Sequence, residues 1–185
     1  ALPILSVWIM LMVEMTTREV ERFSVEGRVV VLTGCTGVLG SAYCRVFAER
    51  GARLVMADLA EREPAAKAAA LSEATGAEVL GFSCDIGSEP DVVTLFQSAM
   101  KHFGRVDVVM NNAAATGEHL MKVGKVFAPF EEYPLAVWDQ VLRTNLTGVF
   151  LVAREGGKAM LESGGGSLIN RSEEHTSELQ SPNTI

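Results

Sequence analysis

The stretch Thr33-Gly34-Cys35-Thr36-Gly37-Val38-Leu39-Gly40 joins a β-branched run, Val29–Thr33, to a helical stretch that begins at Leu39. Its glycines let the backbone turn tightly and come close to a pyrophosphate group. The first turn of the following helix offers unpaired N–H groups and the positive end of its dipole to the phosphate charge. The residues that we expect to contact a dinucleotide here are Thr33, Gly34, Thr36, Gly37, Val38, Leu39 and Gly40.

An acidic residue stands at the spacing that such a turn requires. Asp58 ends a second β-branched run and lies 18 residues after Gly40, close to the roughly 20 expected of a carboxylate that binds the adenosine ribose hydroxyls. Asp58 would repel a 2′-phosphate, and neither Cys35 nor Leu59 carries a basic group to hold one. The pattern favours NAD over NADP, with Asp58 and Leu59 at the adenosine end. A tight turn beside a surface carboxylate is the structural alternative.

Between residues 27 and 170, short β-branched runs alternate with helical stretches, which is typical of a parallel sheet covered by helices on both faces. The predicted strands are Val29–Thr33, Arg53–Asp58, Glu78–Asp85, Val106–Asn111 and Ser167–Asn170. The predicted helices are Leu39–Arg50, Glu63–Thr75, Glu89–Phe103 and Leu135–Leu161, with Gly51, Gly76 and Gly104 as stops. The strands read as buried on both faces. The predicted fold class is α/β, a Rossmann-like doubly wound parallel sheet that is incomplete, with the first five strands.

Composition excludes several classes of protein. The 185 residues suit one domain, and the formal net charge of −7 leaves no basic stripe for a nucleic acid. Three cysteines without a Cys-x-x-Cys pair predict no metal site, no disulfide framework and a cytoplasmic setting. The apolar run from Ala1 to Val13 is shorter than the about 20 residues that span a bilayer, so no membrane association is expected.

Both ends differ in character from the middle of the chain. Residues 1–14 read as an upstream extension, because Met15 and the polar residues after it look like a more natural start. Residues 171–185 contain only Leu179 and Ile185 as apolar side chains, so they are predicted to be a foreign or disordered tail. Their order resembles a translated sequencing adapter. The predicted NAD-binding domain is therefore residues 15–170.

Several motifs together resemble the short-chain dehydrogenase/reductase family over residues 27–170. They are Thr33-Gly34-x-x-Gly37-x-x-Gly40, Asp58, Asp85, Asn111-Asn112-Ala113-Ala114 and Asn145. The resemblance implies hydride transfer between a nicotinamide cofactor and a secondary alcohol or ketone, and a homo-oligomer when the protein is intact. By the same resemblance Asp85 and Ile86 meet the adenine, Asn112, Ala113 and Ala114 lie along the cofactor, and Asn145 is catalytic through a proton-relay water.

Each of these roles has a structural alternative. Asp85 could instead be a helix cap or turn carboxylate, and Asn145 a polar helix residue bonded to a local carbonyl. The glycine spacing also departs from the family, whose common form has glycine where this chain has Val38. That spacing is typical of sugar-nucleotide epimerases and dehydratases of the extended branch, which is an alternative reading.

Most of the family's catalytic centre has no counterpart in the sequence. The chemistry needs a Tyr-x-x-x-Lys pair, because a phenol serves near neutral pH only when a nearby positive charge stabilises its phenolate. Here Tyr43 is followed by Phe47, and Tyr133 by Val137. The chain is therefore predicted to be an inactive part of an enzyme, cut off before its catalytic Ser, Tyr and Lys, or alternatively a non-catalytic dinucleotide-binding module. The long connection at 113–134 is predicted to be functional.

Overall fold

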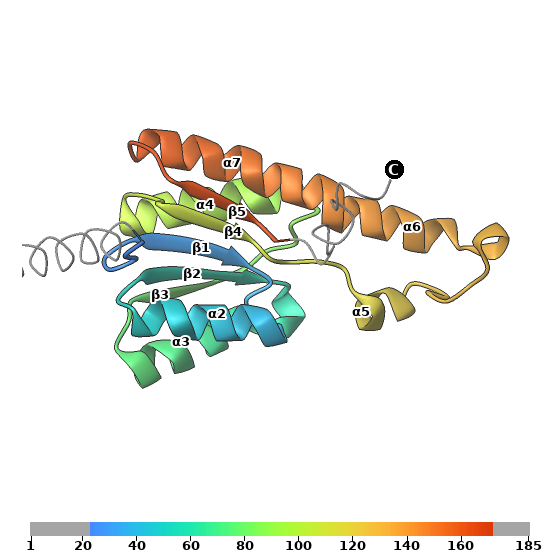
Figure 1. Cartoon of the computed structure of the whole chain (residues 1–185), viewed down its shortest axis with the longest axis horizontal. Helices are drawn as coiled ribbons and strands as arrows, with labels where there is room; N and C mark the ends of the chain where they lie inside the picture. The colour runs from blue at the N-terminus through green and yellow to red at the C-terminus, as the bar shows by residue number, and fades with distance from the viewer. Residues whose placement is uncertain (1–22, 172–185) are drawn as a thin grey trace, which may run out of the picture.

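The computed structural model describes residues 23–171 (Figure 1). The predicted extension at 1–14 lies outside these residues, as does the predicted tail at 171–185 apart from Arg171. The described chain contains one sheet of five parallel strands in the order β3-β2-β1-β4-β5. The strands are β1 Val29–Thr33, β2 Arg53–Asp58, β3 Val79–Ser83, β4 Val108–Asn111 and β5 Ser167–Asn170. The predicted parallel α/β sheet is confirmed.

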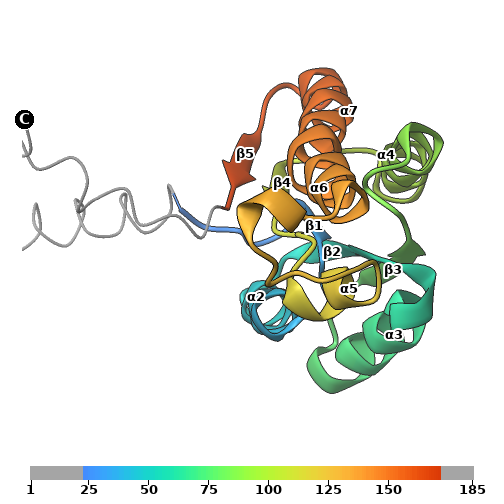
Figure 2. The same cartoon turned by 90° about the vertical axis from the view of Figure 1, so that its right-hand side faces the viewer.

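Helices cover both faces of this sheet. The helical elements are α2 Val38–Glu49, η1 Ala60–Arg62, α3 Pro64–Thr75, α4 Glu89–Phe103, α5 Gly117–Met121, η2 Phe130–Glu132, α6 Leu135–Leu142, η3 Arg143–Gly148 and α7 Val149–Glu162. Figure 2 shows α2 and α3 below the sheet and α4 and α7 above it. No helix among the described residues is long and apolar enough to cross a membrane.

Strand β1 shows why the sheet needs both layers. All five of its residues are buried, and successive side chains point to opposite faces. Val29 and Val31 join the core under α4 and α7, whereas Val30 and Leu32 join the core over α2 and α3. A continuous apolar run is therefore the correct signal for a strand buried on both faces.

The edge strand β5 contradicts the expectation that every strand is buried on both faces. All four of its residues are exposed, with Leu168 at 39% and Ile169 at 40% of their accessible surface. The strand pairs with β4 on one side, and α7 is the helix that contacts it among the described residues. Its composition is that of a buried strand, but its position at the edge leaves its apolar side chains open.

The helix predicted over Leu135–Leu161 is present and contains a π-helical turn that the prediction did not include. It divides into α6 and α7, separated by the π-helical turn η3 at Arg143–Gly148. Gly148 lies so close to Ile86 that a Cβ on the glycine would be 2.8 Å from Ile86 Cγ1. Apolar periodicity continues through a single π turn, so the sequence pattern did not reveal it.

Smaller differences concern boundaries and the long connection. The predicted strands Glu78–Asp85 and Val106–Asn111 are shorter in the structure, at Val79–Ser83 and Val108–Asn111. Residues 113–134 contain α5 and η2, and a small separate core of Ala115, Leu120 and Val137 packs this segment against α6. The connection is thus a structured element at the carboxyl ends of the strands.

Asp107 fastens the opposite end of the sheet, where β1 and β4 begin. Its side chain is 4% exposed and accepts hydrogen bonds from the Val29 N–H at 2.9 Å, from Arg28 and from Arg105. Burial by itself would raise the pKa of Asp107, but these donors outweigh it and hold the pKa below its usual value. The carboxylate therefore stabilises the fold in its ionised form.

We expect Asp107→Ala to lower the free energy of unfolding by about 1–3 kcal/mol near neutral pH, because the buried Val29 N–H loses its partner. The folded-state pKa is depressed, so this contribution is complete above the ordinary aspartate pKa of about 3.9 and disappears as pH falls through the folded-state value. Urea unfolding at several pH values measures both effects. Asp139→Ala, at an exposed position of α6, is the control. An equal loss of unfolding free energy in both variants would contradict a stabilising role of Asp107. So would a difference in unfolding free energy between wild type and Asp107→Ala that does not decrease in acid.

Candidate functional site

A pocket of about 720 Å³ lies at the carboxyl ends of the strands. It opens beside β1, whose two neighbours β2 and β4 lead the chain away in opposite directions across the sheet. Ligands of open α/β sheets bind at such a switch in strand order. The predicted residues that line it are Gly34, Thr36, Gly37, Val38, Leu39, Gly40, Asp58, Leu59, Asp85, Ile86, Asn112, Ala113 and Ala114.

The three glycines of the turn have different reasons to be glycine. Gly34 has φ +67°, and a Cβ there would lie 2.7 Å from Ala113 Cα. A Cβ on Gly40 would lie 2.0 Å from the Gly34 carbonyl oxygen. A Cβ on Gly37 would meet nothing closer than that same oxygen at 3.6 Å, and its φ of −69° suits any residue. Packing thus explains Gly34 and Gly40, whereas Gly37 is an exposed glycine at the N-cap of α2.

Thr33 supports the turn from beneath. Its hydroxyl accepts hydrogen bonds from the N–H groups of Asn112 and Ala113, each at 3.2 Å, and donates to the Met110 carbonyl at 3.4 Å. The Asn112 side-chain amide donates back to the carbonyls of Thr33 and Gly34. Thr33 is fully buried and does not line the pocket. Thr33 therefore supports the turn from inside the protein, whereas the sequence predicted that it contacts the cofactor.

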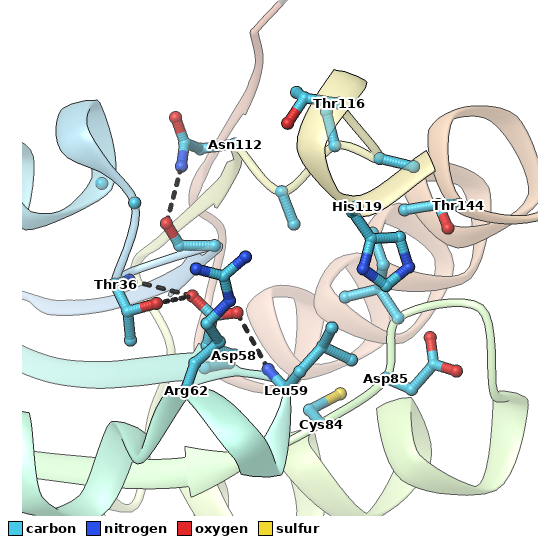
Figure 3. Close-up of a pocket in the computed structure, with 18 of the residues that line it drawn as sticks. Thr36, Asp58, Leu59, Arg62, Cys84, Asp85, Asn112, Thr116, His119 and Thr144 are labelled. Carbon is cyan, nitrogen blue, oxygen red and sulfur yellow. Dashed lines mark hydrogen bonds between the residues drawn. The ribbon is translucent and has the colours of Figure 1, made fainter. Parts of the chain in front are cut away.

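Asp58 stands at the rim with its carboxylate held by backbone and hydroxyl donors (Figure 3). One oxygen accepts from the Thr36 N–H at 2.9 Å and from the Thr36 hydroxyl at 2.7 Å. The other oxygen accepts from the Leu59 N–H at 2.9 Å. The acidic residue after β2 and the glycine turn after β1 are therefore joined directly.

Asp85 is both a turn carboxylate and a residue of the pocket, the two alternatives that its sequence context allowed. One carboxylate oxygen accepts from the Gly87 N–H at 2.9 Å, which is the turn role, and the other pairs with Arg143. The residue also lines the pocket, together with Ile86. The Arg143 pair ties the loop after β3 to η3.

Asn145 lies in η3 and does not line the pocket. Its side-chain oxygen accepts from the Ala115 N–H at 2.7 Å, and its amide donates to the Ala115 carbonyl at 3.4 Å. The bonded backbone is 30 residues away along the chain, so the alternative of a bond to a local carbonyl is not what the structure shows. Asn145 fixes the point where the chain leaves β4 for α5.

Several residues outside the sequence motifs also line the pocket. They are Ala57, Glu61, Arg62, Cys84, Ala115, Thr116, His119, Gln140, Arg143, Thr144 and Arg171. Gln140, Arg143 and Thr144 share one side of α6 and η3, which helical spacing could have suggested, whereas Arg62 belongs to a short turn with no periodicity. Burial raises the pKa of the Cys84 thiol to about 12, and the negative charges of Asp91 and Asp85 act in the same direction. The Cys84 thiol therefore stays neutral.

The pocket suits an anionic dinucleotide. Val38, Leu39 and Gly40 form the first turn of α2, where backbone N–H groups have no partner within the helix. Gly34 packs closely against Ala113, so the glycine turn does not block access to that helix end. Phosphate can accept from such N–H groups and is favoured by the helix dipole. Within residues 23–171, no three His, Cys, Asp or Glu side chains gather where they could hold a metal ion.

Comparisons of the sequence agree with this geometry. A sequence model of the family described as short chain dehydrogenase matches residues 28–179. The chain is 35% identical over 148 residues to D-threitol dehydrogenase from Mycolicibacterium smegmatis, which covers 80% of this chain and 53% of that protein. It thus spans about half the length of the curated relatives that it matches.

Solved structures are similar over the same region. NAD+-bound xylitol dehydrogenase matches with a TM-score of 0.73 and 28% identity over 86% of this chain and 57% of that one. NADPH-dependent 3-quinuclidinone reductase from Rhodotorula rubra matches with a TM-score of 0.67 and 25% identity, over 80% of this chain and 53% of that one.

The glycine contacts predict opposite outcomes for two similar substitutions. We expect Gly40→Ala to lower the free energy of unfolding by about 3 kcal/mol or more, because the methyl group would overlap the Gly34 carbonyl. Gly37→Ala is expected to change it by less than about 1 kcal/mol, since its methyl group would make only an ordinary van der Waals contact, with the Gly34 carbonyl oxygen at 3.6 Å. Thermal and urea unfolding of the two variants measure this difference. Equal stability of the two would show that the turn does not pack as described.

Proposed function

Because the chain belongs to the short-chain dehydrogenase/reductase family, we propose that its pocket binds NAD and that the complete protein is an NAD-dependent oxidoreductase. Its substrate would be a secondary alcohol or the corresponding ketone. The observation that carries the proposal is the direct bonding of Thr36, in the glycine turn, to Asp58 at the end of β2. That bond supports the proposal because it brings the glycine turn, which would bind phosphate, next to Asp58, which would bind the ribose.

Each part of the bound cofactor would meet a different element. The N–H groups of residues 38–40 would hold the pyrophosphate, and Asp58 would accept hydrogen bonds from the adenosine ribose hydroxyls. Asp85 and Ile86 would lie at the adenine, and residues 112–114 would run along the cofactor. Asp58 disfavours a further phosphate on the ribose, which supports the preference for NAD. When bound, the nicotinamide would supply the hydride acceptor of the reaction.

The catalytic role of Asn145 stays a prediction. Its amide already bonds the Ala115 backbone in both directions, so its immediate effect is to hold the connection that forms one wall of the pocket. We propose that the chain of 185 residues binds the cofactor without turning over substrate, because its sequence contains no Tyr-x-x-x-Lys pair to move the hydroxyl proton. A cytoplasmic location and a homo-oligomeric complete protein are part of the same proposal.

Titration of the purified chain with NAD tests the proposal. We expect saturable binding and a higher unfolding temperature, because a ligand at about 100 times its Kd adds about 2.7 kcal/mol to stability. Asp58→Ala should weaken NAD binding about tenfold or more, as loss of a charge-assisted hydrogen bond does. Glu73→Ala, an exposed change on α3, is the control. No NADH should form when alcohols are added. Failure to bind NAD would refute the binding proposal, and NADH formation would refute the proposed inactivity.

A further inference from the structure

Three consecutive residues of the loop between β3 and α4 pack against the π turn η3. One carboxylate oxygen of Asp85 accepts a hydrogen bond from the Arg143 guanidinium at 2.5 Å, and the Gly87 carbonyl accepts from Arg143 Nε at 3.4 Å. A Cβ on Gly87 would lie 2.8 Å from that same Nε. Ile86 lies against Gly148, where η3 ends. The Arg143 side chain therefore lies directly on the loop that brings Asp85 to the pocket.

A second carboxylate lies beside Asp85. One oxygen of Asp91, in the first turn of α4, accepts from the Asp85 N–H at 3.1 Å, and the other accepts from the Ser88 hydroxyl at 3.0 Å. Like charges that lie close together repel each other unless a cation is near. Among the described residues, Arg143 is the cation that forms an ion pair with Asp85. Its guanidinium therefore offsets the repulsion between the two carboxylates.

The rest of the pocket leaves this pair undisturbed. The other charged side chains and the histidine that line the pocket are Asp58, Glu61, Arg62, His119 and Arg171. Figure 3 shows Asp85 on the same side of the view as His119 and Thr144, with Asp58 and Arg62 on the other side of Leu59. In the part of the chain that the structure describes, no ion pair connects Asp58, Glu61, Arg62 or His119 to Asp85 or Arg143. The orientation of the Asp85 carboxylate therefore depends on Arg143 and on the Gly87 N–H.

Asp85 keeps acceptor capacity toward the pocket. Its side chain is 34% exposed and lines the pocket. A carboxylate has about four lone-pair positions on its two oxygens, and the Gly87 N–H and Arg143 each occupy one. These bonds fix the carboxylate before a ligand arrives, so less side-chain freedom is lost on binding. The remaining positions can accept a hydrogen bond from an N–H group of a ligand.

We propose that Arg143 is a positioning residue that acts through Asp85, holding its carboxylate where it accepts a hydrogen bond from the 6-amino group of adenine. This inference rests on the proposed dinucleotide binding and deepens it. The sequence motifs do not include Arg143, because its effect on the pocket arises only where η3 meets the loop after β3. Asn145 of the same turn bonds Ala115, so η3 would position the adenine end of the pocket and the wall at Ala115 together.

Calorimetric titration of the full chain with NAD and with nicotinamide hypoxanthine dinucleotide tests this inference. The second compound has a carbonyl oxygen in place of the 6-amino group, so it cannot donate to Asp85. Wild type should bind NAD about tenfold more tightly, the size of one hydrogen bond to a charged group. Arg143→Gln should reduce this preference about fivefold, because the Asp85 side chain must then be ordered on binding. Arg143→Lys keeps the charge without the planar paired donors, so its preference should be intermediate.

Arg154→Gln is the matched control. Arg154 pairs with Glu89 at the start of α4, outside the pocket, so its removal should leave the preference for NAD unchanged. Asp85→Asn provides a second test. The preference should be lost in this variant, because an amide can also donate to the hypoxanthine carbonyl. Adding Arg143→Gln to Asp85→Asn should then change the preference no further, because Arg143 acts through Asp85.

Several outcomes would overturn the role of Arg143. They are equal weakening of both ligands by Arg143→Gln, an unchanged preference in that variant, and a preference that survives Asp85→Asn. If Arg143→Gln does not fold, Arg143→Lys and Asp85→Asn carry the test. Binding of both dinucleotides by wild type without a preference would overturn this inference and leave the proposed NAD binding intact. Absence of binding by either dinucleotide would refute the proposed function and this inference with it.

Discussion

The contact between the end of β1 and the start of the chain after β4 is the constraint on which the pocket depends. Asn112 donates two hydrogen bonds to Thr33 across this junction, from its backbone N–H and from its side-chain amide, and Gly34 lies against Ala113 with no space for a side chain. Because β1 and β4 are neighbours in the sheet, this contact packs the chain after β1 directly against the chain after β4. The glycine turn therefore continues on the side of α2. A small change here would move the turn, the helix end and the wall formed by residues 113–115 together.

The opposite wall depends on two tethers from η3. Arg143 pairs with Asp85 after β3, and Asn145 bonds Ala115 after β4. One π turn therefore holds segments from both halves of the sheet. π turns recur at functional sites because they redirect side chains that a regular helix would place elsewhere. In this molecule the redirected side chains position the walls of the pocket, while α6 and α7 continue in nearly the same direction (Figure 1).

Electrostatics in the pocket follow from local pairing more than from net charge. The chain is acidic overall, yet Asp58 is held by three donors and Asp85 by Arg143. Arg62 then contributes a cation without a carboxylate partner among the described residues. An anionic ligand can therefore enter a pocket in a chain whose net charge of −7 would by itself repel it. At the other end of the sheet, the buried Asp107 is likewise held by local donors, in a structural role.

Strand and helix periodicity in the sequence determined the parallel sheet, because β1 and β2 are apolar on both faces and the glycines after α3 and α4 adopt the left-handed conformation that ends a helix. The spacing from Gly40 to Asp58 likewise indicated that the turn and the carboxylate would meet. Tertiary structure alone decided the rest. Thr33 proved to be a buried support, β5 an exposed edge, and Arg62 part of the pocket. Periodicity reports which face of an element is apolar, whereas these three outcomes depend on which neighbours a residue meets after the sheet has assembled.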